Sequence, residues 1–450
     1  MILLAYYGDD FTGSTDVLEA LTTSGVETML FTEPPTAAQL AEFPDLRAYG
    51  VAGNSRTMSP AEMDASLPAV FESLRDGGPA VVHYKVCSTF DSSPTVGSIG
   101  RATEIGRRVF QNRCVPLVVG APHLQRFCVF GNLFARSGLD SPVYRLDRHP
   151  TMSRHPVTPM NEADLGVHLA KQTSLPVELV DLTLLDRGDD LATEAVDRAQ
   201  NIVLFDTLTN DHLAQIGRLV WRCHERDERP QFVVGSSGVE AALTMHWRST
   251  GEIASESKGF PPPHPVDRAV VISGSCSPVT DRQIAWGLEN GFADVPVDTL
   301  RLADLNEFDA VVNEVVERAV AELDAGRSPI VHTSRGPNDA RSANTAQTAL
   351  NRLTGESLGV ILGRILGAVL RSRRIERVAV AGGDTSGAVA RAIGIDALMM
   401  IGPLAPGAPL CVAHSRNAEV AGVEFTFKGG QVGHDDFFGS LLAGGAKAYR

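Results

Sequence analysis

ERVAVAGGDTSGAVARAIG, residues 376–394, has the pattern of a strand, a glycine-rich turn and a helix. Residues 377–381 are a short β-branched apolar run, long enough for one buried strand. The glycine pair 382–383 allows a tight turn at which the backbone can approach a ligand. Thr385 or Ser386 is expected to cap a helix that ends at the last glycine of the segment. This arrangement aims free backbone N–H groups at an anion, usually phosphate, although an ordinary strand–helix connection shares the pattern.

Two further turns in the same half of the chain carry the same type of signal. The strand expected at 269–273 runs into a Gly-Ser-Cys-Ser-Pro turn whose hydroxyls, Ser275 and Ser277, suit phosphate, although they also suit helix capping. Near the C-terminus, Lys428 stands directly before two glycines, an arrangement that suits phosphate or another acidic ligand. Neither GxxxxGK[ST] nor GxGxxG occurs, so a Walker-type loop and a dinucleotide fingerprint are both absent. Three such turns in one half predict a nucleotide site.

The N-terminal half carries a different chemistry. Asp9, Asp10 and Asp16 surround a Gly/Thr/Ser turn after the first apolar run, where they can bind hydroxyls, hold a metal, accept a proton, or only cap a helix. Arg56 follows another predicted strand and can clamp a carboxylate, and Lys85 ends a third strand. Thr89 and Asp91 lie in the turn after Lys85, and His155 lies in a proline-bracketed segment where a structural role is the commoner one. Together these residues predict a polar pocket for a small hydroxylated acid.

Composition narrows the classes of protein. The chain has 450 residues and a formal net charge of −14, which argues against nucleic acid because its phosphates require a basic surface. The six cysteines have neither CxxC nor zinc spacing, so reduced thiols in the cytoplasm are expected. The N-terminus lacks the pattern of a signal peptide, and no apolar run has the length of a membrane span. A cytoplasmic enzyme without a membrane partner is expected.

Strand and helix patterns alternate along most of the chain, which predicts an α/β protein with parallel strands. The alternation is interrupted by a polar stretch that becomes proline-rich, STGEIASESKGFPPPHPV. We therefore expect two domains, 1–250 and 267–450, joined by a linker at 251–266. Each is expected to be a largely parallel sheet flanked by helices, with the active site in the cleft between them.

At these same residues the chain resembles the four-carbon acid sugar kinases, formerly a domain-of-unknown-function family. The resemblance covers nearly the whole chain and is carried by GDDFTGSTD (8–16), NSRT (54–57), YKVCSTFDSS (84–93), HPVTPM (155–160), GSSG (235–238), SGSCSPVTDRQ (273–283), GGDTSG (382–387) and KGGQVGHDDFF (428–438). The family usually opens with Ala-Asp-Asp and has Lys-Ser-Gly-Asn-Phe-Gly near its end, so this chain departs from it at Gly8 and at 429–432.

The resemblance implies a sugar-acid-binding N-terminal domain and a nucleotide-binding C-terminal domain. The reaction it implies is ATP-dependent phosphorylation of the terminal hydroxyl of a four-carbon acid such as threonate, erythronate or a 3-oxo-tetronate, with Mg²⁺. The nucleotide contacts are expected at Ser275, Ser277, Gly382, Gly383, Asp384, Thr385, Gly387, Lys428 and Gly430. The substrate contacts are expected at Asp16, Arg56, Lys85, Thr89, Asp91 and His155, with no metal ligand assigned.

The catalytic base is expected among Asp10, Asp9 and Asp384, and the sequence does not choose between them. The alternative function is a non-catalytic metabolite- or nucleotide-binding protein of the same architecture. A dehydrogenase is disfavoured because GxGxxG is absent. A small sugar acid is the expected partner, and a homodimer is considered as the assembly.

Overall fold

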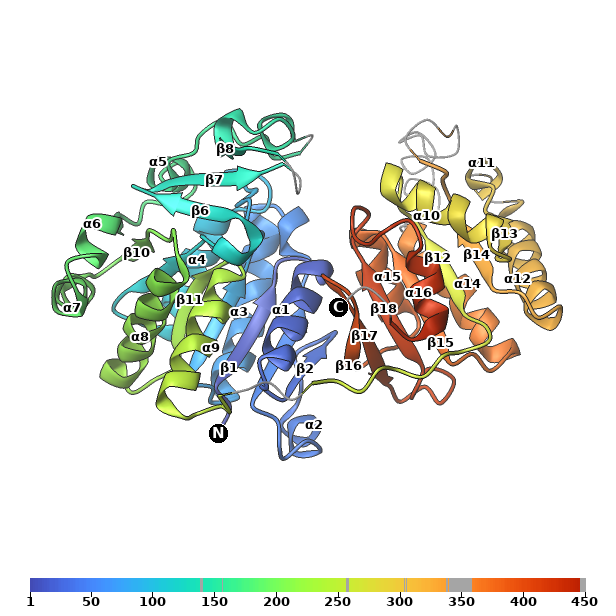
Figure 1. Ribbon diagram of the computed structural model, residues 1–450, viewed down its shortest axis with the longest axis horizontal. Coiled ribbons are helices and arrows are strands. Elements are labelled where there is room, and N and C mark those ends of the chain that lie inside the picture. The colour runs from blue at the N-terminus through green and yellow to red at the C-terminus, as the bar shows by residue number, and fades with distance from the viewer. Residues whose placement is uncertain are drawn as a thin grey trace. The chain divides into compact units, whose positions relative to one another are not determined.

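The computed structural model describes residues 1–450 apart from 138–140, 156, 256–258, 303, 305, 337–338, 340–357 and 446–450. Its chain divides into two compact units. Unit 1 comprises 1–28 and 34–258, and unit 2 comprises 29–33 and 259–450. Each unit is a sheet with helices packed on it (Figure 1). The predicted α/β fold is confirmed.

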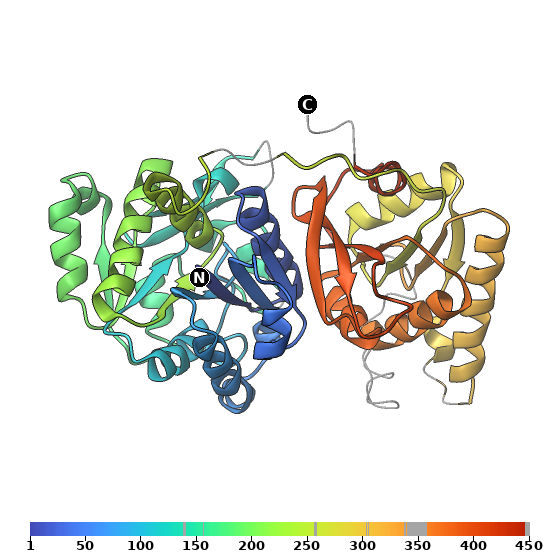
Figure 2. The same ribbon diagram turned by 90° about the horizontal axis from the view of Figure 1, so that it is seen from below.

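Unit 1 contains a parallel sheet in the order β3-β1-β4-β11-β5-β10-β9. Helices lie on both faces of this sheet (Figure 2). The strands are β1 (Leu4–Gly8), β3 (Ala48–Ala52), β4 (Val81–Lys85), β5 (Val115–Val118), β9 (Val177–Val180), β10 (Ile202–Phe205) and β11 (Gln231–Gly235). The helices are α1 (Phe11–Thr23), α2 (Ala37–Ala41), α3 (Pro60–Asp76), α4 (Ile99–Phe110), α5 (Leu165–Leu169), α6 (Leu182–Leu185), α7 (Asp189–Arg198), α8 (Asn210–Asp227) and α9 (Gly238–Thr250).

The local sequence explains where these elements begin. Helix α3 starts with a capping box, in which Ser59 accepts from the N–H of Glu62 and Glu62 accepts from the N–H of Ser59, with Pro60 at the first helical position. The strands are buried on both faces, as their continuous apolar runs predict. Phe71 packs on Tyr84 and Phe232, which joins α3 to the sheet in one aromatic core. The expected parallel sheet therefore rests on ordinary apolar burial.

A small antiparallel sheet was not predicted from the sequence. It consists of β6 (Arg126–Val129), β7 (Asn132–Arg136) and β8 (Val143–Arg145), in that order. Its burial pattern alternates along β7, as expected for a sheet with one face on the core.

Unit 2 contains a mixed sheet in the order β13-β14-β12-β15-β18-β17-β16-β2. The parallel strands are β12 (Val270–Ser273), β13 (Ala293–Pro296), β14 (Pro329–His332), β15 (Arg377–Ala381) and β18 (Glu424–Lys428). The helices are α10 (Pro278–Glu289), α11 (Thr299–Leu302), α12 (Phe308–Asp324), α14 (Leu358–Ser372), α15 (Gly383–Ala392) and α16 (Phe437–Ala443). The start that the sequence predicts for α14, at 354–356, lies outside the described residues.

The sheet of unit 2 ends in antiparallel strands that the alternation did not predict. Strands β16 (Ala397–Ala405) and β17 (Ala408–His414) form a hairpin, coloured orange in Figure 2. Strand β2 (Thr28–Phe31) pairs antiparallel with β16. This pairing explains why residues 29–33, from the half expected to form the first domain, belong to unit 2. The Thr32 hydroxyl fixes the segment by donating to the Ile395 carbonyl over 2.6 Å.

Candidate active site

The first acidic cluster lies at the carboxyl ends of neighbouring strands β1 and β3. Asp9 and Asp10 follow β1 directly, and Arg56 lies in the short 3₁₀ turn Ser55–Thr57 after β3. The Arg56 guanidinium binds Asp9 with both arms, Nη2 to Oδ1 at 2.6 Å and Nε to Oδ2 at 3.1 Å. Its Nη1 also bonds to Asp10 Oδ2. The sequence assigned Arg56 to a substrate carboxylate, and in the structure it holds two carboxylates of the protein.

Burial controls the charges of this cluster. Burial raises the pKa of Asp9 to about 6, an effect that the Arg56 guanidinium reduces and the carboxylates of Asp10 and Asp91 increase. Burial acts to lower the pKa of Arg56, but Asp9 and Asp10 outweigh it and raise that pKa well above its usual range. Arg56 therefore stays charged, while Asp9 titrates near the pH at which proton transfer is useful.

The second cluster is built on β4 and β11, which are neighbours in the sheet. Lys85 ends β4 and is 3% exposed, and its Nζ donates to Asp16 Oδ2 on α1 over 3.1 Å. The Ser237 hydroxyl, after β11, donates to the same oxygen over 2.7 Å. Burial acts to raise the pKa of Asp16, but Lys85 and Ser237 outweigh it and hold that pKa below its usual value. Asp16 and Lys85 therefore form an ion pair in which Lys85 is buried and the Asp16 side chain is 35% exposed.

The two clusters flank one glycine. A methyl group placed on Gly13 would lie 2.6 Å from Asp10 Oδ1 and 3.8 Å from Lys85 Nζ. The Gly13 N–H also donates to Asp10 Oδ1, so Asp10 caps α1 as one sequence alternative expected. The structure thus brings together Asp9, Asp10, Asp16, Arg56 and Lys85 at one edge of the sheet of unit 1. Any side chain at residue 13 would obstruct this edge.

The remaining predicted substrate contacts divide between the cluster and a local turn. Thr89 and Asp91 are buried and bonded to one another, and Asp91 is close enough to affect the pKa of Asp9. His155 instead accepts at Nδ1 from the N–H of Thr158 over 3.1 Å. For His155 the structural role that the sequence favoured matches these contacts, and a substrate contact stays a prediction.

Three turns converge at the carboxyl ends of β12, β15 and β18 in unit 2. A methyl group placed on Gly430 would lie 2.7 Å from Ser275 Oγ, and one placed on Gly382 would lie 3.4 Å from Ser275 N. Gly382 has φ +122°, in the region that favours glycine, and its N–H donates to the Lys428 carbonyl over 2.9 Å. Position 382 favours glycine through its φ, and a side chain at position 430 would collide with Ser275 Oγ.

The helix after β15 starts earlier than the sequence predicts. Neither Thr385 nor Ser386 is the N-cap, because α15 begins at Gly383 and Gly382 takes the cap position without a side-chain bond. Ser386 instead donates its hydroxyl to the Gly382 carbonyl from inside the first turn. The glycine cap leaves the first N–H groups of α15 without a side-chain acceptor from the cap, as an anion site requires. The helix ends before Gly394, as predicted.

Lys428 is the buried cation of this group of turns. Its side chain is 0% exposed, Nζ donates to Thr280 Oγ1 over 3.2 Å, and it lies 5.7 Å from the Phe437 ring centroid. No carboxylate pairs with it among the residues that the structure describes. Burial lowers the pKa of Lys428 to about 8. A buried lysine without a carboxylate partner is a candidate for binding an anion.

The other predicted nucleotide residues line the same turns. Ser277 caps α10 by accepting from the N–H of Val279 over 3.1 Å, so its hydroxyl has a structural partner. Asp384 is exposed on the first turn of α15. Thr385 and Gly387 are buried on α15, and Gly383 is its first residue. These residues lie together, and their contacts to a nucleotide stay predictions.

Sequence reasoning missed two residues of these sites. Ser237 bonds to Asp16, and Thr280 receives the bond from Lys428 and donates to the Gly430 carbonyl over 2.9 Å. Both lie in stretches that the family resemblance included, but neither is charged. Ser237 is two residues after β11, so its position after a strand end was a signal for it, whereas Thr280 lies inside the first turn of α10 and had no such signal.

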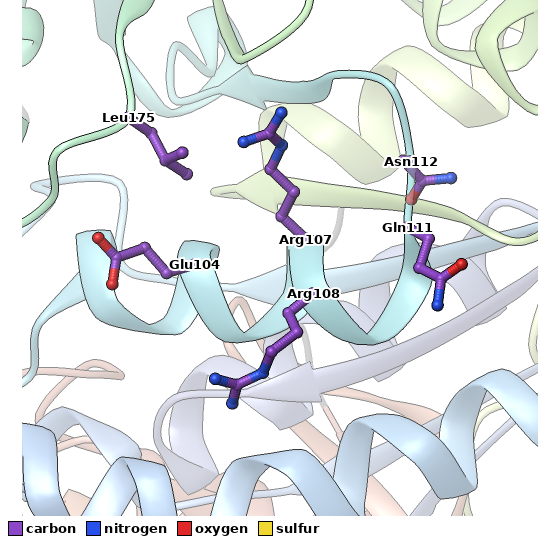
Figure 3. Close-up of a pocket in the computed structure, with 6 residues that line it drawn as sticks. All are labelled: Glu104, Arg107, Arg108, Gln111, Asn112 and Leu175. Carbon is purple, nitrogen blue, oxygen red and sulfur yellow. The ribbon is translucent and has the colours of Figure 1, made fainter.

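A cavity of about 370 Å³ in unit 1 lies away from all of these residues. Figure 3 shows that Arg107 and Arg108 leave α4 in different directions, so their guanidinium groups do not converge on one ligand. None of the predicted site residues lines it; the lining consists of Glu104, Arg107, Arg108, Gln111, Asn112 and Leu175. We therefore place the candidate site at the strand ends.

Metal ligands and membrane segments were also sought. Within the described ranges, no group of three or more His, Cys, Asp or Glu side chains is arranged to hold a metal ion. A helix long and apolar enough to cross a bilayer is likewise absent from the part of the chain that the structure describes.

Solved structures share this fold over nearly the whole chain. A Salmonella typhimurium LT2 protein matches with a TM-score of 0.76 and 24% identity, covering 98% of each chain. A Haemophilus influenzae protein of a domain-of-unknown-function family matches with a TM-score of 0.70 and 23% identity, covering 97% of this chain and 98% of its own. At these identities the likeness concerns the fold alone.

Sequence comparisons identify the family. Residues 4–243 match the sugar-binding N-terminal domain, and 270–438 match the nucleotide-binding C-terminal domain. A 3-oxo-isoapionate kinase of Paraburkholderia graminis is 47% identical, over 98% of this chain and 94% of the relative. A 3-oxo-tetronate kinase of Methylobacterium radiotolerans is 30% identical, over 98% and 99%. With two matched domains that carry the acid cluster and the glycine turns, the chain belongs to the four-carbon acid sugar kinase family.

Proposed function

We propose that this chain phosphorylates a hydroxyl of a small 3-oxo sugar acid with ATP. The observation that carries the proposal is its 47% identity, over nearly the full length of both chains, to a 3-oxo-isoapionate kinase. Kinases named for 3-oxo-tetronate, at 30% identity or less, support the same class of acid. The first candidate substrate is therefore 3-oxo-isoapionate, followed by the 3-oxo-tetronates.

The sugar side supplies cations for the acid and a base for its hydroxyl. Arg56 and Lys85 hold the substrate carboxylate in this proposal, exchanging part of their contact with the protein carboxylates for it. Asp10 takes the proton of the attacking hydroxyl, because its side chain is 23% exposed and can be reached, whereas that of Asp9 is 5% exposed. Asp9 then serves mainly to orient Arg56.

The nucleotide side fits ATP through its geometry. The N–H groups at the start of α15 and the side chain of Lys428 neutralise phosphate charge, and Gly430 and Ser275 allow close backbone approach. Mg²⁺ accompanies ATP in this proposal and screens the phosphates. It is usually held by one or two carboxylates together with phosphate oxygens, and the exposed carboxylate of Asp384 would be one such ligand. These residues position the phosphates and neutralise their charge, which is most of the catalysis that phosphoryl transfer requires.

Location and assembly complete the proposal. We place the protein in the cytoplasm, where ATP is available, and treat a homodimer as a prediction that light scattering after gel filtration tests.

The test is ADP release with Mg-ATP against 3-oxo-isoapionate, both 3-oxo-tetronates, threonate and erythronate. We expect turnover on a 3-oxo acid, with kcat/KM at least about tenfold above the 3-hydroxy acids, because donors arranged around a planar carbonyl fit a tetrahedral carbinol less well, and the hydroxyl brings a hydrogen that needs its own acceptor. Equal or greater turnover on threonate or erythronate would reject the 3-oxo assignment. Silence on every acid would reject the kinase itself.

A further inference from the structure

Beneath Lys85 lies a buried pair of titratable groups to which the proposed mechanism gives no part. His83 is two residues before Lys85 on β4, so both side chains point to the same face of the sheet. Glu240 lies in the first turn of α9, directly after β11 (Figure 1). Glu240 Oε1 is 3.7 Å from His83 Nδ1, and the two side chains are 1% and 0% exposed. Neither Glu240 oxygen has a hydrogen-bond partner among the described residues.

One hydrogen bond assigns the tautomer of His83, and the contact with His83 together with burial assigns the protonation state of Glu240. His83 Nε2 is 3.1 Å from the Gly235 carbonyl, which can only accept, so Nε2 carries the proton of the neutral ring. His83 Nδ1 then presents a lone pair to Glu240, and only a protonated carboxyl can face it favourably. Burial raises the pKa of Glu240 to about 8 and lowers that of His83 to about 3. At neutral pH both groups are uncharged.

The charges around Glu240 come from two other elements. Lys85 and His83 face it from β4, and Asp16 faces it from α1. After burial, the Lys85 ammonium is the largest influence on Glu240 and favours its ionised form, whereas the Asp16 carboxylate opposes that form. With Glu240 neutral, Lys85 has one carboxylate partner, Asp16, at 3.1 Å. With Glu240 ionised, the charges of two carboxylates would act on Lys85.

We propose that Glu240 is a positioning residue which acts through Lys85: as a neutral acid under the lysine, it leaves Lys85 enough positive charge to bind the carboxylate of the substrate. The inference rests on the proposed function, because it needs an anionic substrate at Lys85. Ionisation of Glu240 adds a second buried negative charge beside that carboxylate and weakens its binding. The effect falls on the affinity for the acid, because Glu240 touches neither the reacting hydroxyl nor the phosphates.

The consequence is a pH-dependent KM for the acid. If the acid binds only while Glu240 is protonated, KM rises by about tenfold between pH 7 and pH 9, of which about fivefold falls between pH 8 and pH 9, since one proton is exchanged for one bound anion. Glu240→Gln has the shape and charge of the neutral acid at every pH. In this variant KM should change by less than about twofold from pH 7 to pH 9, as a group with no charge to gain cannot repel the substrate.

The experiment measures KM and kcat for the acid at pH 7, 8 and 9 with saturating ATP, in the wild type, Glu240→Gln and Glu72→Gln. Glu72 is exposed on α3, so its variant is a matched control that should keep the wild-type rise. A wild-type KM that stays level to pH 9, or an equal rise in Glu240→Gln, would overturn the inference. A change in kcat with unchanged KM would overturn it too.

A protein without turnover on any acid would reject the proposed function, and the inference is then decided by a second measurement. Carbon-13 NMR of labelled glutamate, with Glu240→Gln to assign its carboxyl signal, follows the titration directly. Titration of Glu240 near pH 8 supports a neutral acid beneath Lys85, and titration below pH 6 overturns it.

Discussion

Lys428→Met should stabilise unit 2 while it weakens ATP binding. The wild-type lysine is fully buried, and its Nζ contacts only Thr280 Oγ1 and the Phe437 ring among the described residues. Burial lowers its pKa from 10.5 to about 8, so keeping the charge below pH 8 costs about 3 kcal/mol of folding free energy. Methionine fills a similar volume without a charge. The substitution therefore removes that cost.

The gain is reduced by the contacts that are lost. The cation–π contact with Phe437 contributes about 0.5–1 kcal/mol, while the Thr280 hydroxyl keeps its bond to the Gly430 carbonyl. The net stabilisation is about 2 kcal/mol, or about 4–8 °C in the melting temperature of a unit of this size. Because the native pKa of Lys428 is depressed, wild-type stability rises with pH between about 8 and 10.5, and the advantage of the variant shrinks over that window.

Calorimetry at pH 7 and pH 9.5 measures the stability, and titration with ATP measures the affinity. The variant should lose about tenfold or more in ATP affinity, since one charge-assisted phosphate contact contributes about 1.5–3 kcal/mol. Lys171 is exposed, so Lys171→Met is the matched control and should change neither quantity. A lower melting temperature together with unchanged ATP affinity would refute the argument, because Lys428 would then be structural.

Three further predictions follow from unit 1. Asp10→Asn should lower kcat by about a hundredfold or more with little change in ATP affinity, because amides accept no proton; wild-type kcat would remove Asp10 as the base. Arg56→Lys should cost about 1–2 kcal/mol in urea unfolding because the two-armed contact is lost. Arg198→Lys, at an exposed one-armed ion pair with Glu194, should cost under about 0.5 kcal/mol, and equal losses would contradict the difference. Between pH 6.5 and 8, native Glu240 keeps a proton that the unfolded chain has released, while native His83 stays neutral and unfolded His83 loses up to about half a proton, which reduces the fall. The free energy of unfolding should therefore fall by at most about 2 kcal/mol over this window, and a similar fall in Glu240→Gln would contradict the assignment.

Local sequence patterns predicted the strands and turns whose conformation depends on residues close together in the chain. The strand at 377–381 and the glycine turn after it follow from a β-branched run and from the lack of side chains at 382–383. The cap of α15 was predicted wrongly because Thr385 and Ser386 are good caps by type, whereas Gly382 already takes the conformation at which the helix starts. The residue type alone therefore does not locate a helix N-cap to within three residues.

Pairing between distant segments was harder to predict. Residues 397–414 are apolar throughout, and the Pro406-Gly407 turn in their centre was the signal for the hairpin of β16 and β17. Nothing in residues 29–33 indicates a partner more than 360 residues away, yet β2 pairs with β16. Such a pairing depends on the closed fold and not on the local residues.

In the candidate site too, the positions of residues could be predicted from local sequence, whereas their distant partners could not. Asp9, Asp10, Arg56 and Lys85 were chosen because they follow strands, and parallel strands bring their carboxyl ends together. Their partners were not predictable: Arg56 binds Asp9 across 47 positions of sequence, and Lys85 binds Asp16 across 69. The cleft between domains that the sequence suggests stays a prediction.

The central claim is tested most directly by phosphorus NMR of the protein with Mg-ATP and 3-oxo-isoapionate. The account predicts that a phosphate monoester of the acid grows one for one with ADP, and that Asp10→Asn forms it at least about a hundredfold more slowly. ADP accompanied only by inorganic phosphate, or unchanged ATP with this acid and with the 3-oxo-tetronates, would contradict the assignment of a sugar acid kinase.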